Sequence, residues 1–478
     1  MIKKAVVSGV KWTSVSQIGR QFMQWITIVI LARILSPSDF GLVGMAMVVI
    51  GFVTIFKDLG TSAAIIQRKE YSDDLLSSVY WVNVTFGFLA TIVMFLLSPL
   101  IGAFYEEARV TALIRVLSLT FFISGLSILH QALLERQLAF SKLAKLELAA
   151  TMLSSIVGIA SALLGFGVWS LVYQTMTMVL TTTVFLWVVS TWRPRFVFHW
   201  KEVKSVSSYS LNLSGFNIFN YFARNVDNLL IGRFLGAQDL GYYSLAYRIM
   251  LLPLQSISAV VTRVMFPVYS QIRDDSARFR RVFLQITGTI AFLTFPMMIG
   301  LMVLREPFVT VIFGTQWEPV VLLLAILAPV GMTQSIISTL GTIYQAKGRT
   351  GLFFRWGTSV GLLVMLSFVV GLRWGIVGVA TAYAITTVIL SYPSFAIPFK
   401  LINLPMRELG VVLWKSFLCS IIMSVVLLGL MRTVLSEASD KTMLGILIPV
   451  GVIVYLLASY FINRNILKQL KDIARGKE

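Results

Sequence analysis

The stretch WVNVTFGFLATIVMFLLSPLIGA, residues 81–103, carries no charged side chain. An α-helix of this length spans the apolar core of a bilayer and leaves no backbone hydrogen bond open to lipid. Similar apolar runs recur along the chain, for example at 282–304 and 415–430. The sequence therefore predicts an all-α integral membrane protein.

Composition agrees with a membrane protein. A soluble chain of 478 residues would form about three domains. Here 57% of the residues are hydrophobic and only 13% are charged, and the mean hydropathy is +0.84. We expect about fourteen transmembrane helices, at 13–35, 40–65, 79–103, 110–134, 143–165, 168–190, 208–232, 242–268, 282–304, 318–344, 352–371, 376–398, 411–431 and 442–462.

The formal charge of +19 is explained by topology. With these spans, 26 Lys and Arg residues fall in the loops and tails of one side and seven on the other. Cytoplasmic loops collect Lys and Arg, so both termini are predicted to be cytoplasmic. A nucleic-acid partner is therefore not expected.

The chain repeats itself. LARILSPSDFG at 31–41 aligns without gaps with IGRFLGAQDLG at 231–241, an offset of 200. Later matches run at an offset of 208: Pro99/Pro307, Gln137/Gln345 and Gly167/Gly375. We predict two six-helix lobes, at 1–205 and 206–400, followed by a helix pair and a basic cytoplasmic tail at 401–478.

Six helices per lobe is an even number, so both lobes enter the membrane in the same sense. This is the parallel-repeat architecture of transporters, whose substrate site lies between the repeats near the midplane. The last helix pair falls outside the repeat. It either packs peripherally or guides a lipid tail.

The long first helix ending in Arg-x-Leu, the short turn, the Asp-x-Gly opening the second helix and their echo at 224–243 carry a family resemblance. The chain resembles the polysaccharide transporter (Wzx-type flippase) family of the multidrug/oligosaccharidyl-lipid/polysaccharide exporter superfamily, and within it the colanic and teichuronic acid exporter group. The resemblance implies a two-lobe transporter that moves undecaprenyl-diphosphate-linked oligosaccharide to the outer leaflet by alternating access. It also implies a bacterial plasma (inner) membrane, membrane lipids as surroundings, and a polysaccharide polymerase with other assembly proteins as partners.

Polar side chains inside the spans are the candidate substrate site, because they are costly there and mark transport pathways. Polar stripes follow the first helix of each lobe. Guanidinium groups can fork two hydrogen bonds to phosphate, so a basic cavity suits a diphosphate. The candidates for substrate binding are Arg20, Gln24, Asn217, Asn220, Arg224, Arg248 and Arg263.

Coupling to a proton or sodium gradient needs a carboxylate in the membrane. Asp227 and Asp58 are the only acids predicted well inside the spans, and they are the candidate ion-coupling residues. Two structural alternatives stay open: an ion pair of Arg224 with Asp227, and a paired interfacial feature at Lys57–Asp58. Asp39 is expected to cap the helix that follows it, and so is Asp239.

Other function classes fit less well. A membrane-embedded glycosyltransferase or polymerase would need acids or histidines on external loops, but these loops are short and the chain has only two histidines. No phosphate-binding Gly-Lys-Ser/Thr loop and no metal-ligand cluster is evident in the sequence. We therefore expect a transporter with no cofactor, not an enzyme. A multidrug exporter and a lipid II flippase of the same superfamily remain alternatives.

Overall fold

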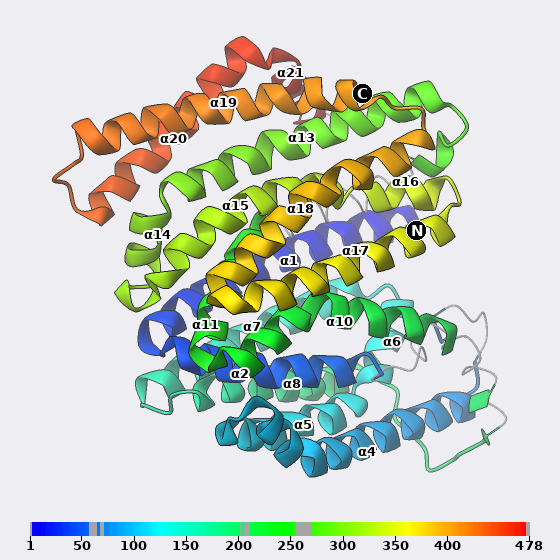
Figure 1. Cartoon of the computed structure of the whole chain (residues 1–478). Coiled ribbons are helices and arrows are strands. Elements are labelled where there is room, and N and C mark those ends of the chain that lie inside the picture. The colour runs from blue at the N-terminus through cyan, green and yellow to red at the C-terminus, as the bar shows by residue number, and fades with distance from the viewer. Residues whose placement is uncertain are drawn as a thin grey trace. The chain divides into compact units, whose positions relative to one another are not determined.

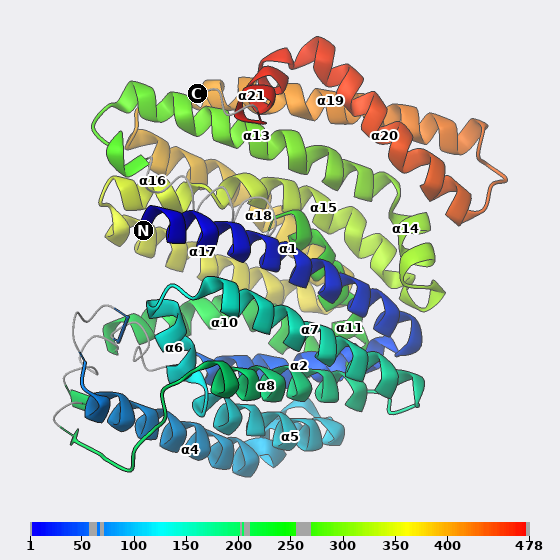
Figure 2. The ribbon, with the colours of Figure 1, turned by 180° about the vertical axis from the view of Figure 1, so that it is seen from behind.

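The computed structural model describes residues 2–56, 65–66, 71–200, 203–204, 211–254 and 269–474. Within these ranges, side chains are described except at 2–15, 211–219 and 470–474. Every element of the described residues is a helix, as Figures 1 and 2 show.

The chain divides into two compact units, Met1–Gly241 and Tyr242–Glu478. The first holds α1 (Ile2–Ile34), α2 (Pro37–Thr54), α4 (Asp73–Tyr105), α5 (Ala108–Gly125), α6 (Ile128–Arg136), α7 (Phe140–Leu163), α8 (Trp169–Val189) and α10 (Leu211–Phe234). The helix α11 (Gly236–Pro253) crosses the boundary. The second holds α13 (Ser276–Val303), α14 (Arg305–Ile312), α15 (Pro319–Ile337), α16 (Leu340–Ala346), α17 (Thr350–Gly371), α18 (Gly375–Lys400), α19 (Met406–Thr433), α20 (Asp440–Ile462) and α21 (Arg464–Ala474).

In the first unit, the polar first helix α1 packs along α7, which also packs on α8. α4 pairs with α5, and α5 joins this pair to α8 and α2. α10 packs on α2, where the hydroxyl of Tyr221 donates to the carbonyl of Val48 over 2.6 Å.

In the second unit, α13 lies against both α15 and α19. Its aromatic side chains fill the core: Phe283 meets Phe399 edge to face at 5.7 Å. The last helix pair, α19 and α20, forms a hairpin on α13 (Figure 1). There the buried hydroxyl of Tyr455 donates to the carbonyl of Phe292 over 2.8 Å.

The helix starts follow from local chemistry. Ser36 caps α2: its hydroxyl accepts from the backbone N–H of Asp39, whose carboxylate accepts from the backbone N–H of Ser36 over 2.9 Å. Pro37 stands at the first helical position, where its missing N–H costs nothing. The capping role expected of Asp39 is confirmed.

Length and hydropathy identify ten candidate membrane spans among the described residues. One of them, Thr350–Lys400, contains both α17 and α18. The prediction of an all-α membrane protein is confirmed. The count of fourteen spans stays a prediction, and so do the lobe boundaries at 205/206 and 400/401.

Candidate functional site

The polar stripe of α1 runs past a close contact of this helix with α7. A Cβ atom at Gly19 would lie 3.1 Å from Cδ2 of Leu148. That contact is tighter than most, so the absence of a side chain at Gly19 lets the two helices approach. The next residue on α1, Arg20, and the preceding residue on α7, Glu147, therefore lie side by side.

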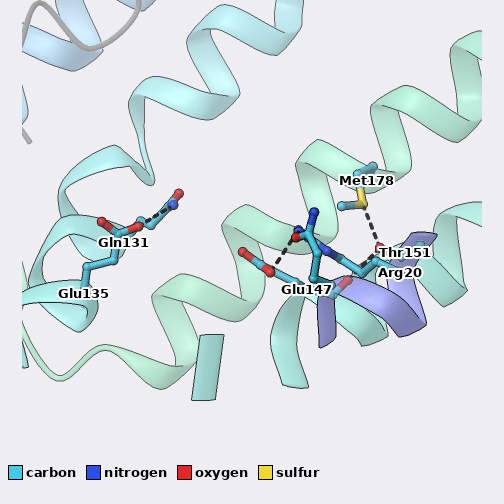
Figure 3. Close-up of polar contacts among 7 residues, drawn as sticks. Arg20, Gln131, Glu135, Glu147, Thr151 and Met178 are labelled. Carbon is cyan, nitrogen blue, oxygen red and sulfur yellow. Dashed lines mark hydrogen bonds and ion pairs between the residues drawn. The ribbon is translucent and has the colours of Figure 1, made fainter. Parts of the chain in front are cut away.

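Arg20 and Glu147 form an ion pair (Figure 3). Nη1 of Arg20 lies 2.9 Å from Oε2 of Glu147. Nη2 of Arg20 donates to Oε1 of Gln17 over 2.6 Å. The side chains of Arg20 and Glu147 are 26% and 31% exposed, so both remain within reach of an incoming group. The guanidinium is accessible, but it is already neutralised.

The stripe continues along α1 with side chains of differing access. Gln17 and Gln24 are exposed. Thr27 is buried, and its hydroxyl donates to the carbonyl of Met23 over 2.8 Å. This hydroxyl is therefore already bonded within α1. The accessible part of the stripe is one guanidinium flanked by two amides.

Further polar contacts surround the pair (Figure 3). One turn beyond Glu147, the hydroxyl of Thr151 donates to the Glu147 carbonyl over 2.8 Å. On α6, the amide of Gln131 donates to the carboxylate of Glu135 over 2.9 Å. Glu135 lies close enough to Glu147 for the two negative charges to interact.

Glu147 is a further acid within a candidate membrane span, Phe140–Leu163. It lies in the third turn of α7. The sequence carried a signal: Glu147, Thr151 and Ser154 recur at helical spacing and mark a polar edge. What the sequence could not show is that this edge faces Arg20, 127 positions earlier in the chain.

The stripe of α10 is described in part. Asn220 is half-buried and Arg224 is exposed. Asp227 is only 2% exposed, and its carboxylate accepts from the backbone N–H of Asn228 over 2.8 Å. Asn217 lies in α10, but its side chain is outside the described residues.

Three other candidates lie in the second unit or outside the described residues. Arg248 is exposed on α11, in the second unit. Arg263 and Asp58 are outside the described residues. The structure thus leaves the substrate and ion-coupling roles of all nine candidates as predictions. It also shows that Arg20 pairs with Glu147.

The two repeated motifs meet each other within the first unit. A Cβ atom at Gly41 would lie 1.6 Å from the carbonyl oxygen of Ala237. Reciprocally, a Cβ atom at Gly241 would lie 1.9 Å from the carbonyl oxygen of Pro37. The start of α2 therefore crosses the start of α11 at two glycines that occupy the same position in the repeat.

Carboxylates near this crossing have shifted pKa values. Burial raises the pKa of Asp239, in the first turn of α11, above its ordinary value. In the α4–α5 connection, hydrogen bonds from Arg109 hold the pKa of Glu107 below its ordinary value. The Arg109 fork is bidentate, with donor–acceptor distances of 2.9 and 2.8 Å.

Comparison with known proteins shows which family this sequence matches. A family model described as polysaccharide biosynthesis protein matches residues 30–322. The chain is 32% identical to the teichuronic acid biosynthesis protein TuaB of Bacillus subtilis, over 95% of each chain. It is 26% identical to the succinoglycan biosynthesis transport protein ExoT of Rhizobium meliloti, over 99% of this chain and 97% of that one.

A solved structure shares the fold. The lipid II flippase MurJ, in an inward closed conformation, superposes with a TM-score of 0.78 at 20% identity, over 96% of this chain and 100% of that one. The transporter-type helical fold expected from the sequence is confirmed. Because the family model covers more than half of the chain and the identity to TuaB extends over nearly all of it, the chain belongs to the polysaccharide biosynthesis protein family.

Proposed function

We propose that this protein is a flippase for lipid-linked oligosaccharides. It carries an undecaprenyl-diphosphate-linked repeat unit from the cytoplasmic to the outer leaflet by alternating access, for export of a cell-surface polysaccharide. Family membership supports this function, as do relatives whose names refer to teichuronic acid biosynthesis and to succinoglycan biosynthesis transport.

One structural observation carries the proposal furthest. On α1, the accessible guanidinium of Arg20 lies between the exposed amides of Gln17 and Gln24. A guanidinium binds a diphosphate through paired, charge-assisted hydrogen bonds. Amides both donate and accept, which suits sugar hydroxyls. The polyprenyl tail needs no polar site, because it stays in the lipid.

The surroundings of the reaction follow from the same proposal. The protein is a multi-pass protein of a bacterial inner membrane with both termini in the cytoplasm, where its basic loops lie. Its product is handed to a polysaccharide polymerase. A proton or sodium ion drives the cycle, with Asp227 and Asp58 as the proposed coupling carboxylates.

The test is headgroup translocation in reconstituted vesicles. Purified protein is inserted into liposomes that contain a labelled undecaprenyl-diphosphate oligosaccharide, and exposure of the headgroup on the far side is measured. We expect Arg20→Ala to reduce the rate at least about ten-fold, the loss of one charge-assisted phosphate contact of about 1.4 kcal/mol.

Arg281→Ala is the control, since Arg281 is an exposed arginine in the second turn of α13 that the proposed site does not use. It should leave the rate unchanged. A wild-type protein that inserts correctly but does not move the headgroup would overturn the flippase function. Wild-type transport by Arg20→Ala would remove Arg20 from the mechanism.

A further inference from the structure

An ion pair occupies the place where the substrate phosphate is proposed to bind. Both terminal nitrogens of Arg20 have partners: Nη1 faces Glu147 at 2.9 Å, and Nη2 donates to Gln17 at 2.6 Å. A phosphate that approaches this guanidinium meets a carboxylate already in position. The two anions cannot share one face of the guanidinium without repelling each other.

The carboxylate of Glu147 can separate from the guanidinium of Arg20. Each of the two side chains is about one-quarter to one-third exposed, so neither charge is locked in the protein interior. Because the pair is partly exposed, an incoming group of higher negative charge can reach the guanidinium and displace the carboxylate. The nearby negative charge of Glu135 also repels the carboxylate of Glu147.

We propose that Glu147 is an intramolecular competitor for the substrate phosphate. When the site is empty, Glu147 holds Arg20. When a diphosphate arrives, it displaces the carboxylate, and when the headgroup leaves, Glu147 pairs with Arg20 again. The inference rests on the proposed function, because it takes Arg20 to be the group that binds the phosphate.

The size of the effect follows from the fraction of Arg20 that is free. Apparent affinity falls by the fraction of molecules that are competent to bind. A pair that is closed about five times as often as it is open leaves the guanidinium free in roughly one molecule in six. Glu147 therefore weakens phosphate binding about six-fold.

The same competition speeds release. Without Glu147, no carboxylate pairs with Arg20 when the diphosphate leaves, so the empty state loses this favourable contact. With Glu147, the charge of Arg20 is neutralised as the headgroup leaves. Removing the carboxylate should therefore tighten binding and slow turnover at saturating substrate.

The test measures binding of undecaprenyl diphosphate to the full-length protein in nanodiscs. Glu147→Gln keeps the size of the side chain and removes its charge. We expect its dissociation constant to fall about six-fold, while its maximal transport rate in vesicles also falls. Arg20→Ala should weaken binding, and Arg20→Ala/Glu147→Gln should bind like Arg20→Ala alone, because Glu147 acts through Arg20.

Glu135→Gln is the matched control. It removes a negative charge from the same region, where the carboxylate of Glu135 accepts a hydrogen bond from the amide of Gln131. Its dissociation constant should stay within about two-fold of the wild type. Should Glu147→Gln fail to insert, Glu147→Asp keeps the charge, lengthens the gap to Arg20 and should tighten binding by a smaller factor.

The outcomes separate the two proposals. Weaker or unchanged binding by Glu147→Gln, with binding lost in Arg20→Ala, overturns the competitor and leaves the flippase site standing. Equal tightening by Glu135→Gln would show a general charge effect and also overturns it. Unchanged binding by Arg20→Ala overturns both the competitor and the assignment of Arg20 to the site.

Discussion

Replacing Gly41 by alanine tests the crossing of α2 and α11. The added Cβ atom would lie 1.6 Å from the carbonyl oxygen of Ala237. Real Cβ atoms essentially never come closer than 3.0 Å, so the two backbones must separate by about 1.4 Å (3.0 minus 1.6). The obstacle is backbone, which cannot rotate away as a side chain can.

This separation has a definite energetic consequence. Overpacking a well-packed contact by one methyl group costs about 1–3 kcal/mol. Because the clash here is with a helix backbone, we place Gly41→Ala at the upper end, about 3 kcal/mol. Alanine is the better helix former by up to about 1 kcal/mol, which offsets part of the loss.

The assay is thermal unfolding of the detergent-purified protein, followed by tryptophan fluorescence. Gly44→Ala is the matched control on the same helix, because its Cβ atom would meet only the side chain of Leu240, whose Cδ2 would lie at 3.3 Å. A leucine side chain can give way by that amount, so Gly44→Ala should stay within about 1 kcal/mol of the wild type. If Gly41→Ala unfolds at the same temperature as Gly44→Ala, the reciprocal crossing is not as close as described.

Three further predictions concern caps, burial and pH. Ser36→Ala removes the cap of α2 and should cost about 1 kcal/mol, measured as a lower unfolding temperature than that of Ser38→Ala. Tyr455→Phe removes the buried hydrogen bond to the carbonyl of Phe292 and should cost about 1 kcal/mol in the same assay. The pKa of Glu107 is lowered in the folded state, so this group stabilises the fold above its unfolded pKa, and the contribution is lost as the pH falls through the folded pKa. Glu107→Gln should therefore flatten the loss of stability below about pH 4.5, and an unchanged acid limb would contradict this.

The helical architecture could be predicted because a bilayer leaves the chain few choices. Apolar runs such as 81–103 must become helices in lipid, and the structure has α4 there. The repeat can also be recognised in the sequence. The structure gives a physical reason for glycine at the same position of both motifs. Gly41 and Gly241 each face the backbone of the other motif at the crossing.

The candidate site was predictable only in part, because a stripe shows which residues share a face but not what lies opposite. Spacing on one helix identified Arg20 and Gln24. The partner of Arg20 depends on which helix packs against α1, and hydropathy carries no information on that choice. A charge-complementary polar edge on α7, at Glu147, was the only signal available, and it becomes meaningful only once α1 and α7 are known to be neighbours.

The repeat shows that the ion pair belongs to one half of the chain only. At the offset of 200, Arg20 corresponds to Asn220 and Gln24 to Arg224, so each half keeps one arginine and one amide with their order exchanged. At the offset of 208, Glu147 corresponds to Arg355, which is exposed on α17. The first half therefore places an acid where the second half places a base. At this position of the repeat, a substrate phosphate would meet a competing carboxylate in the first half and a base in the second, so the proposed control of capture and release by Glu147 is asymmetric in a transporter whose helices are otherwise repeated.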